Sequence, residues 1–508
     1  MSIRTALIAG ATSLAAFSTA VAQTPQAPPA SATEDARDAR IRDLEEKVQA
    51  LAEQLAALKA GAADDHRDVQ RIQAAPAVAL NGGRPTIASA DGKNRFAVRG
   101  VAQFDAATYE QDSPGLPDNR RAGADAAEGP NARDLSSGTN FRRARLGIEG
   151  TFDSVWNYAL TAEFGGSGSE STQLQQAFIE YAGWRPFGLT NPLRIRAGAF
   201  TPPTGLEDAT SNTDALFLER AAGAELVRGL AGGDGRSGFG VFANGERWFT
   251  GAVLTGGLVG GTGDFDEQAG FVGRVAGLVL KDDDASVHVG ANINAVLEPG
   301  DRVLGPGVGG GIRLRERPEL RVDGTRLVDT GGLNAEDATA YGLELGGQWK
   351  NFYLAGEYNW IDVSRVAPAA DVSFSGWYVQ GSWILTGEQR KWSPATGGFG
   401  GVKPARPFDI HAGNWGAWEI TGRYSLLDLN DNEGSPGLAT PVDGVRGGKQ
   451  TISTAGLNWY PNQVVRFILQ YQDVGIDRLN PGAVGLATVG APIGQDYQTL
   501  SLRSQFAF

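Results

Sequence analysis

The chain has 508 residues, a formal net charge of −13 and no cysteine. Disulfides, thiol catalysis and thiolate metal sites are therefore excluded, and the acidic balance argues against nucleic-acid binding. With 71 Gly, 22 Phe, 11 Tyr and 11 Trp but one Met, the composition favours many strands and turns over packed helices. At the N-terminus Arg4 precedes an apolar run and the small-residue site Ala20-Val21-Ala22, which predicts a secretory signal peptide at 1–22. That apolar run is too short for a membrane-spanning helix.

Three segments are predicted between the signal peptide and residue 94. Residues 23–33 are rich in Pro and small polar residues and predict a flexible linker. Residues 34–60 predict a helix with the alternating spacing of three and four that marks a coiled-coil seam. Self-association is the favoured interpretation, and an amphipathic helix lying on another surface is the alternative. Residues 61–93, with several Gly and Pro, predict a second linker. The seam consists of Ile41, Leu44, Val48, Leu51, Leu55 and Leu58.

From residue 94 onward the sequence alternates apolar with polar residues in stretches of about ten, separated by turn residues, as outer-membrane barrel strands do. In 417–425 the apolar Trp418, Ile420 and Tyr424 share one face, and charged and hydroxyl side chains share the other. The predicted strands are 94–110, 139–152, 155–165, 172–183, 192–200, 236–245, 247–259, 268–281, 285–296, 338–349, 352–363, 373–386, 414–427, 449–459, 464–474 and 495–508. We therefore predict an all-β fold, a sixteen-stranded antiparallel transmembrane β-barrel over 94–508.

An even strand number places both barrel ends on the periplasmic side, so that short turns and long loops should alternate. Long loops are predicted at 111–138, 201–235, 297–337, 429–448 and 475–494. The segment 387–413 is the exception, because it is a long connection on the short-turn side. The chain ends with Phe506 and Phe508 on one face, which is similar to the assembly signal of outer-membrane barrels.

Several stretches resemble the phosphate-selective porin O and P family. They include FRRARLGIEG at 141–150, GLEDATSNTDALFLERA at 205–221, GAWEITGRYSLLDLND at 416–431 and LRSQFAF at 502–508, in family order. The resemblance implies a homotrimeric porin whose third long loop, 201–235, folds into the lumen and narrows it. It also implies that lumen arginines guide anions inward.

Alternation by itself selects inward arginines as candidates for lining the pore and guiding anions. Inward glutamates on the same faces, such as Glu149, Glu163 and Glu180, offer the alternative that these arginines only form ion pairs. The candidates are Arg99, Arg143, Arg145, Arg194, Arg196, Arg274, Arg423, Arg466 and Arg503.

The chain departs from the family pattern in two ways that argue against phosphate selectivity. Phosphate-selective members of the family use lysines beside the arginines, whereas this chain has no Lys between Lys93 and Lys281. The predicted constriction loop is also acidic. Its candidate residues are Glu207, Asp208, Asp214, Glu219, Arg220 and Arg228.

The three histidines are scattered, and no metal site, catalytic triad or cofactor site is predicted. We therefore predict a passive outer-membrane channel for small hydrophilic solutes that prefers anions, with phosphate and other oxyanions as candidates. The alternatives are a general or weakly cation-selective porin for uncharged nutrients, or a non-channel barrel such as an adhesin or outer-membrane enzyme. Expected partners are membrane lipid, lipopolysaccharide and the barrel-assembly machinery.

Overall fold

The computed structural model describes residues 32–74, 76–111, 134–166, 173–259, 266–300, 311–482 and 489–508. The predicted signal peptide, most of the first linker and most of the loop 111–138 lie outside these residues. The chain divides into two units, residues 1–75 and 76–508, which are described separately. Among the described residues, no helix combines the length and apolar character needed to cross a membrane.

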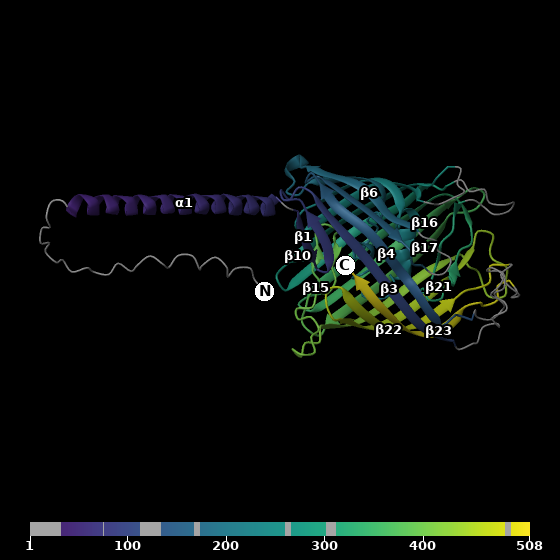
Figure 1. Cartoon of the computed structure of the whole chain (residues 1–508). Coiled ribbons are helices and arrows are strands. Elements are labelled where there is room, and N and C mark those ends of the chain that lie inside the picture. The colour runs from purple at the N-terminus through teal and green to yellow at the C-terminus, as the bar shows by residue number, and fades with distance from the viewer. Residues whose placement is uncertain are drawn as a thin grey trace. The chain divides into compact units, whose positions relative to one another are not determined.

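The second unit is a closed antiparallel β-barrel (Figure 1). All sixteen predicted strands are present, and the first pairs with the last through a continuous register from Val101↔Ala507 to Gln111↔Tyr497. The strands are β3 (Arg95–Gln111), β4 (Gly138–Phe152), β5 (Trp156–Glu163), β6 (Gln173–Trp184), β7 (Leu193–Phe200), β8 (Arg236–Asn244), β9 (Trp248–Leu258), β10 (Ala269–Lys281), β11 (Ala285–Glu298), β15 (Leu333–Trp349), β16 (Phe352–Arg365), β17 (Val372–Ile384), β20 (Ala417–Asp431), β21 (Val445–Tyr460), β22 (Val465–Asp477) and β23 (Gln495–Ala507).

The barrel turns its polar faces inward and its apolar faces outward, which is the reverse of a soluble sheet. On β20, Glu419, Thr421 and Arg423 are buried inside, whereas Ile420 and Tyr424 are exposed outside. Aromatic side chains stack across neighbouring strands on the outer face near the short turns, as in the interfacial girdle of membrane barrels. The stacks are Trp349–Phe352–Trp383 and Trp418–Trp459–Phe467.

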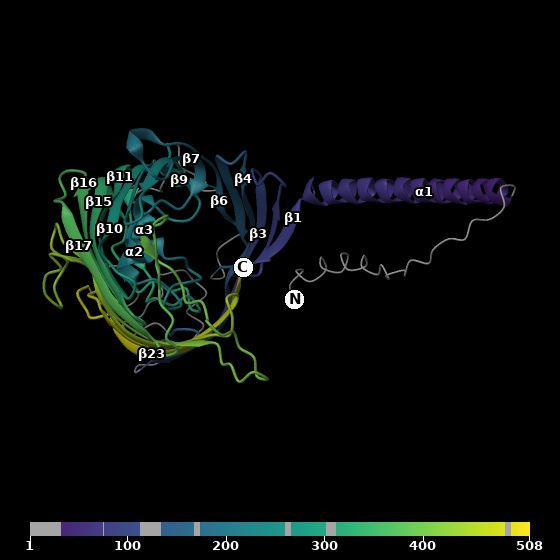
Figure 2. The same cartoon turned by 90° about the vertical axis from the view of Figure 1, so that its left-hand side faces the viewer.

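Three connections fold into the barrel. The loop between β7 and β8 carries α2 (Leu206–Ala209) and α3 (Ala222–Ala231), which lie inside the ring of strands (Figure 2). The connection between β11 and β15 carries β12 (Gly311–Ile312), β13 (Arg315–Glu316) and β14 (Val328–Asp329). The connection between β17 and β20 enters from the short-turn end and carries β18 (Trp392–Ser393) and β19 (Gly398–Phe399). A short 3-10 turn, η3 (Pro186–Gly188), joins β6 to β7.

The first unit contains one helix, α1 (Ala32–Ala74), which includes the predicted 34–60 and continues beyond it. The predicted linker at 61–93 is wrong in this part, because Gly61 costs only about 1 kcal/mol in a helix and the following Ala, Arg and Gln residues favour helix. The six seam residues are all exposed along α1. At 1.5 Å per residue the helix is about 65 Å long.

The remainder of the predicted linker is also structured. β1 (Ala77–Asn81) and β2 (Arg84–Ala88) form a hairpin, and β2 pairs with β3 from Thr86↔Ala97 to Ala88↔Arg95. The two-residue loop is Gly82-Gly83, both with positive φ, which is the requirement of a type I′ hairpin turn. The glycines that suggested flexibility are therefore the turn of an additional hairpin on the barrel.

Candidate functional site

The inserted segments are fixed by buried arginines of the barrel wall. Arg423 on β20 donates from Nη1 to Glu207 Oε1 at 3.1 Å, and from both Nη atoms to the Glu219 carbonyl at 3.1 Å. It also pairs with Glu319, on the connection between β11 and β15. Its guanidinium lies 4.5 Å from the centre of the Phe217 ring. One wall arginine thus holds two different inserted segments.

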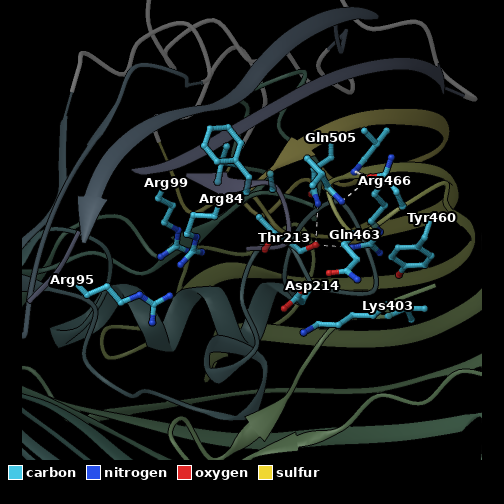
Figure 3. Close-up of a pocket in the computed structure, with 18 residues that line it drawn as sticks. Arg84, Arg95, Arg99, Thr213, Asp214, Lys403, Tyr460, Gln463, Arg466 and Gln505 are labelled. Carbon is cyan, nitrogen blue, oxygen red and sulfur yellow. Dashed lines mark hydrogen bonds between the residues drawn. The ribbon is translucent and has the colours of Figure 1, made fainter. Parts of the chain in front are cut away.

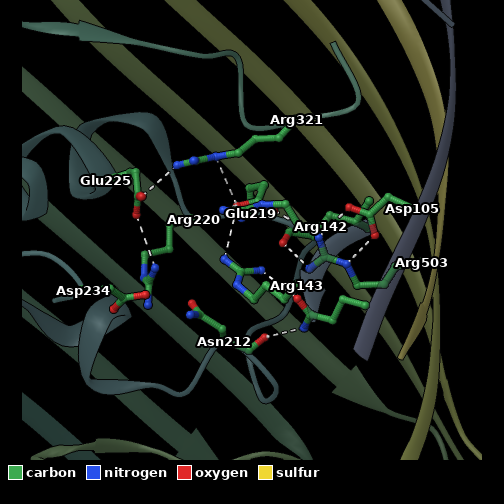
Figure 4. A network of polar contacts seen from close by, with 12 residues as sticks. Asp105, Arg142, Arg143, Asn212, Glu219, Arg220, Glu225, Asp234, Arg321 and Arg503 are labelled. Atoms are coloured by element: carbon green, nitrogen blue, oxygen red, sulfur yellow. Dashed lines mark hydrogen bonds and ion pairs between the residues drawn. The ribbon is translucent and has the colours of Figure 1, made fainter. Parts of the chain in front are cut away.

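Glu219, in the inserted β7–β8 loop, gathers four arginines around one carboxylate (Figure 4). The nitrogen–oxygen distances are 2.7 Å to Arg142, 3.0 Å to Arg503, 3.5 Å to Arg143 and 3.7 Å to Arg321. Burial by itself would raise the pKa of Glu219, but these arginines hold that pKa well below its usual range. Glu219 is therefore ionised and joins the loop to both β4 and β23.

The segment that enters from the short-turn end is fixed in the same way. Arg274 on β10 forms a bidentate pair with Glu344 at 2.8 and 2.7 Å, and it donates to the carbonyl of Gly397 at 2.7 Å. Arg390, within the segment, forms a bidentate pair with Glu419 at 2.8 Å and donates to the Asp214 carbonyl at 2.7 Å. Segments from opposite ends of the barrel therefore meet inside it.

The acids of the predicted constriction loop are neutralised locally. Asp208 lies 2.6 Å from Arg228 and 3.2 Å from Arg220, measured between nitrogen and oxygen. Glu225 lies 3.2 Å from Arg220, and Asp234 pairs with Arg228 and, at 2.8 Å, with Arg145 of β4. The loop is acidic in sequence but presents few unpaired carboxylates to the lumen.

The nine predicted arginines fall into two groups. Five are at most 4% exposed beneath the inserted segments, on β4, β10, β20, β22 and β23. Four keep part of their surface in water and stand on β3, β4 and β7, along the stretch of wall that runs from β3 to β7. The buried group is Arg143, Arg274, Arg423, Arg466 and Arg503. The water-facing group is Arg99, Arg145, Arg194 and Arg196.

The water-facing arginines differ in how strongly they are paired. Arg196 binds Glu180 with nitrogen–oxygen distances of 2.7 and 3.0 Å, and its guanidinium lies 4.1 Å from the Phe178 ring centre. Arg145 pairs with Glu163 and Asp234. Arg194 donates to the Ala395 carbonyl at 3.0 Å. Arg99 lies 3.8 Å from a Glu149 oxygen, which is beyond hydrogen-bond distance, and its side chain is 34% exposed.

Two buried, ion-paired arginines of the interior were missed by the alternation argument, Arg142 and Arg390. Arg142 should face lipid by strand period, but a register shift opposite Gln103 and Phe104 inserts it as a β-bulge, so Arg142 and Arg143 both point inward. Arg390 lies in an irregular segment, where the two-residue period of a strand cannot predict which way a side chain points. The consecutive Arg142-Arg143 pair was itself the available signal, because one of two adjacent arginines would otherwise face lipid.

A cavity of about 280 Å³ opens at the short-turn end of the barrel (Figure 3). It is lined by Arg84 of the hairpin, Arg95 and Arg99 of β3, Lys403 and Arg466, with Asp214 as an acidic neighbour. Among the described residues, no group of three or more His, Asp or Glu side chains is arranged to hold a metal ion.

A closed sixteen-stranded barrel with a polar lumen, inserted loops and an outward apolar band defines an outer-membrane porin. The family model for phosphate-selective porin O and P matches residues 119–508, and the chain belongs to that family. Porin O of Pseudomonas aeruginosa is 25% identical over 358 residues, covering 67% of this chain and 77% of that protein. An uncharacterized protein of Caulobacter vibrioides is 29% identical over 365 residues, or 68% of this chain, and the match spans 65% of its length.

Solved structures with a similar fold include an anion-selective porin from Comamonas acidovorans, with 13% identity and a TM-score of 0.44. That match covers 82% of this chain and 100% of the other. OprB of Pseudomonas putida has 10% identity and a TM-score of 0.45, covering 82% of this chain and 95% of the other. The family match and the sixteen-stranded barrel together place the chain among outer-membrane porins.

We predict that Arg423→Met releases the inserted segments without opening the barrel. The substitution leaves Glu319 buried without its cation, which costs about 3–5 kcal/mol when one partner of a buried pair is removed. Limited proteolysis should then cut within 201–235 and 311–332, while unheated protein still migrates as a folded barrel. Arg247→Met, in an exposed turn, serves as the control. Unchanged protease resistance in Arg423→Met would contradict the role of Arg423 in holding the inserted segments.

A second prediction concerns pH. Burial raises the pKa of Glu207, in α2, from 4.5 to about 7, against the opposing effect of Arg423. Because the folded pKa is raised, the stability that Glu207 contributes is complete below pH 4.5 and is lost as pH rises through 7, by about 3 kcal/mol.

Hydrogen exchange of residues 206–222, corrected for intrinsic rates, should therefore show weaker protection at pH 8 than at pH 5. Glu207→Gln, which stays neutral, should reduce that difference. A variant that keeps the wild-type pH dependence would assign the effect to another group.

Proposed function

We propose that this channel prefers small hydrophilic anions over cations. The observation that carries the proposal is the division of the lumen arginines described above. Arg99, Arg145, Arg194 and Arg196 still face water and stand along the stretch of wall that runs from β3 to β7. Of the deeply buried arginines, Arg274, Arg423 and Arg503 are paired with carboxylates and contribute little net field.

The charge of the water-facing wall supports this preference. Arg194 donates to a carbonyl, and no hydrogen bond or ion pair joins it to a carboxylate within the described part of the chain. Arg99 has only the distant Glu149 oxygen. In a narrow lumen with low-dielectric walls, such incompletely neutralised charges dominate over the screened acids outside. The net charge of −13 therefore does not decide selectivity.

The proposal does not extend to phosphate selectivity. The water-facing cations on β3, β4 and β7 are all arginines, since the chain has no Lys between Lys93 and Lys281. Arginine forks suit carboxylates as well as phosphates, so the preferred solutes are small oxyanions as a class.

We also propose that α1 associates with α1 of other copies as a coiled coil, in a homotrimer. Its seam residues remain uncovered in the single chain, from 46% exposed at Ile41 to 71% at Leu58. A row of six exposed apolar side chains at heptad spacing is unfavourable in water unless a partner helix covers it.

The anion preference predicts that Arg99→Ala with Arg194→Ala lowers the chloride-over-potassium permeability ratio at least about two-fold. The zero-current potential in a KCl gradient measures this ratio, and the change should be larger at low salt. Arg247→Ala provides the control, because that arginine lies in an exposed turn. A wild-type pore that already prefers potassium and does not respond to the double substitution would refute the preference.

The coiled-coil proposal predicts position-specific cross-linking. Because the native chain has no cysteine, Leu51→Cys introduces a single thiol on the seam, and Glu53→Cys introduces one on the opposite face. Oxidation of the full-length protein should give disulfide-linked dimers for Leu51→Cys and few for Glu53→Cys. Equal yields at the two positions would mean that the seam does not meet another copy.

A further inference from the structure

The cavity at the short-turn end is built partly by the β1–β2 hairpin, which precedes the barrel in sequence. Gly82 and Arg84 line it together with the β21–β22 turn, through Asn462, Gln463 and Val464. The hairpin tip lies close against this turn: a Cβ on Gly83 would come within 2.5 Å of the Val464 side chain. The position of Arg84 is therefore fixed by strand pairing on one side and by packing of the tip on the other.

Cationic side chains reach the cavity from two sides. Arg84, Arg95 and Arg99 lie together on the side of the hairpin and β3, whereas Lys403 and Arg466 lie across from them (Figure 3). The Asp214 carboxylate lies between these two groups (Figure 3). A small anion placed centrally would meet this carboxylate. An anion with two separated negative groups could instead contact both cationic groups and leave the centre to its uncharged part.

These cations have unused capacity for a ligand. Within the described part of the chain, the side chains of Arg95 and Lys403 make no hydrogen bond or ion pair. Arg84 pairs with one oxygen of Glu149, and Arg99 lies 3.8 Å from the other. Arg466 is 2% exposed and donates to the carbonyls of Thr213 and Leu216 at 3.2 Å, but its Nε is buried without a partner. A buried donor without a partner is costly, so a ligand group that reached it would be favoured.

We propose that the β1–β2 hairpin completes a binding site at the periplasmic mouth for small organic anions with two separated negative groups. The proposal rests on the anion preference of the channel and adds the ligand class and the residues that select it. Arg84 and its neighbours bind one anionic group, and Lys403 with Arg466 binds the other. The hairpin is thereby part of the permeation pathway.

Succinate and acetate are suitable probes, because they carry two carboxylates and one. Calorimetric titration of the full-length protein in detergent should give succinate binding at least ten-fold tighter than acetate binding. Arg84→Ala and Lys403→Ala should each weaken succinate binding about ten-fold and change acetate binding far less. Because one ligand bridges both groups, the double variant should lose less than the product of the two single losses.

Arg406→Ala is the matched control, since Arg406 is exposed on the same connection as Lys403 and does not line the cavity. Lys403 is exposed and has no partner in the described structure, so its substitution should leave folding intact even if loss of the Arg84–Glu149 pair disturbs the hairpin. Equal affinities for succinate and acetate, or an unchanged succinate affinity in Lys403→Ala, would overturn the site.

Conductance measurements separate this proposal from the anion preference. Diacid binding that depends on Lys403 in a pore that prefers potassium would refute the preference and leave the site standing. A chloride-preferring pore that binds both probes equally would refute the site and leave the preference standing.

Discussion

Buried pairing between guanidinium and carboxylate groups is the interaction on which the interior of this barrel depends. A ring of sixteen strands is too wide for its inward side chains to fill, so chain segments must enter it if the lumen is to be narrowed. Removing an arginine and a carboxylate from water costs several kcal/mol per ion, and only well-aligned pairs repay that cost. Arg274, Arg390 and Arg503 meet this condition, because each faces a carboxylate with two nitrogen–oxygen contacts of 2.6–2.8 Å.

This pairing also determines which arginines remain accessible to water. The inserted segments bury arginines on β4, β10, β20, β22 and β23. The wall formed by β3, β4 and β7 keeps arginines that still contact solvent. Buried and water-facing arginines are not separated by strand: on β4, buried Arg143 and water-facing Arg145 stand two residues apart.

Much of the fold could be predicted because a barrel strand has a period of two and a lipid-facing side. Strands such as β20 can therefore be recognised by alternating apolar and polar residues. The even number of strands then distinguishes the short turns from the long loops. The candidate site was harder to predict from the sequence than the fold. Alternation predicted that Arg423 and Arg99 face the lumen. Whether such an arginine is buried in ion pairs or stays in contact with water depends on the inserted loops, and their conformation cannot be inferred from sequence periodicity. The hairpin was missed because Gly82-Gly83 was interpreted as flexibility, although a Gly pair between short β-prone stretches is also a turn signal.

The bulge at Arg142 limits which sequence changes β4 can tolerate. Upstream of it, Phe141 faces lipid beside Phe104, and Asn140 faces the lumen, where it donates to the Arg321 carbonyl at 2.9 Å. Residues 138–141 have these orientations only because β4 accommodates one extra residue at the bulge. Loss of that single codon would reverse the orientation of every residue from 138 to 141, placing an amide against hydrocarbon and a phenyl ring in water. A one-residue deletion at this bulge should therefore be tolerated far less well than one in a loop between strands.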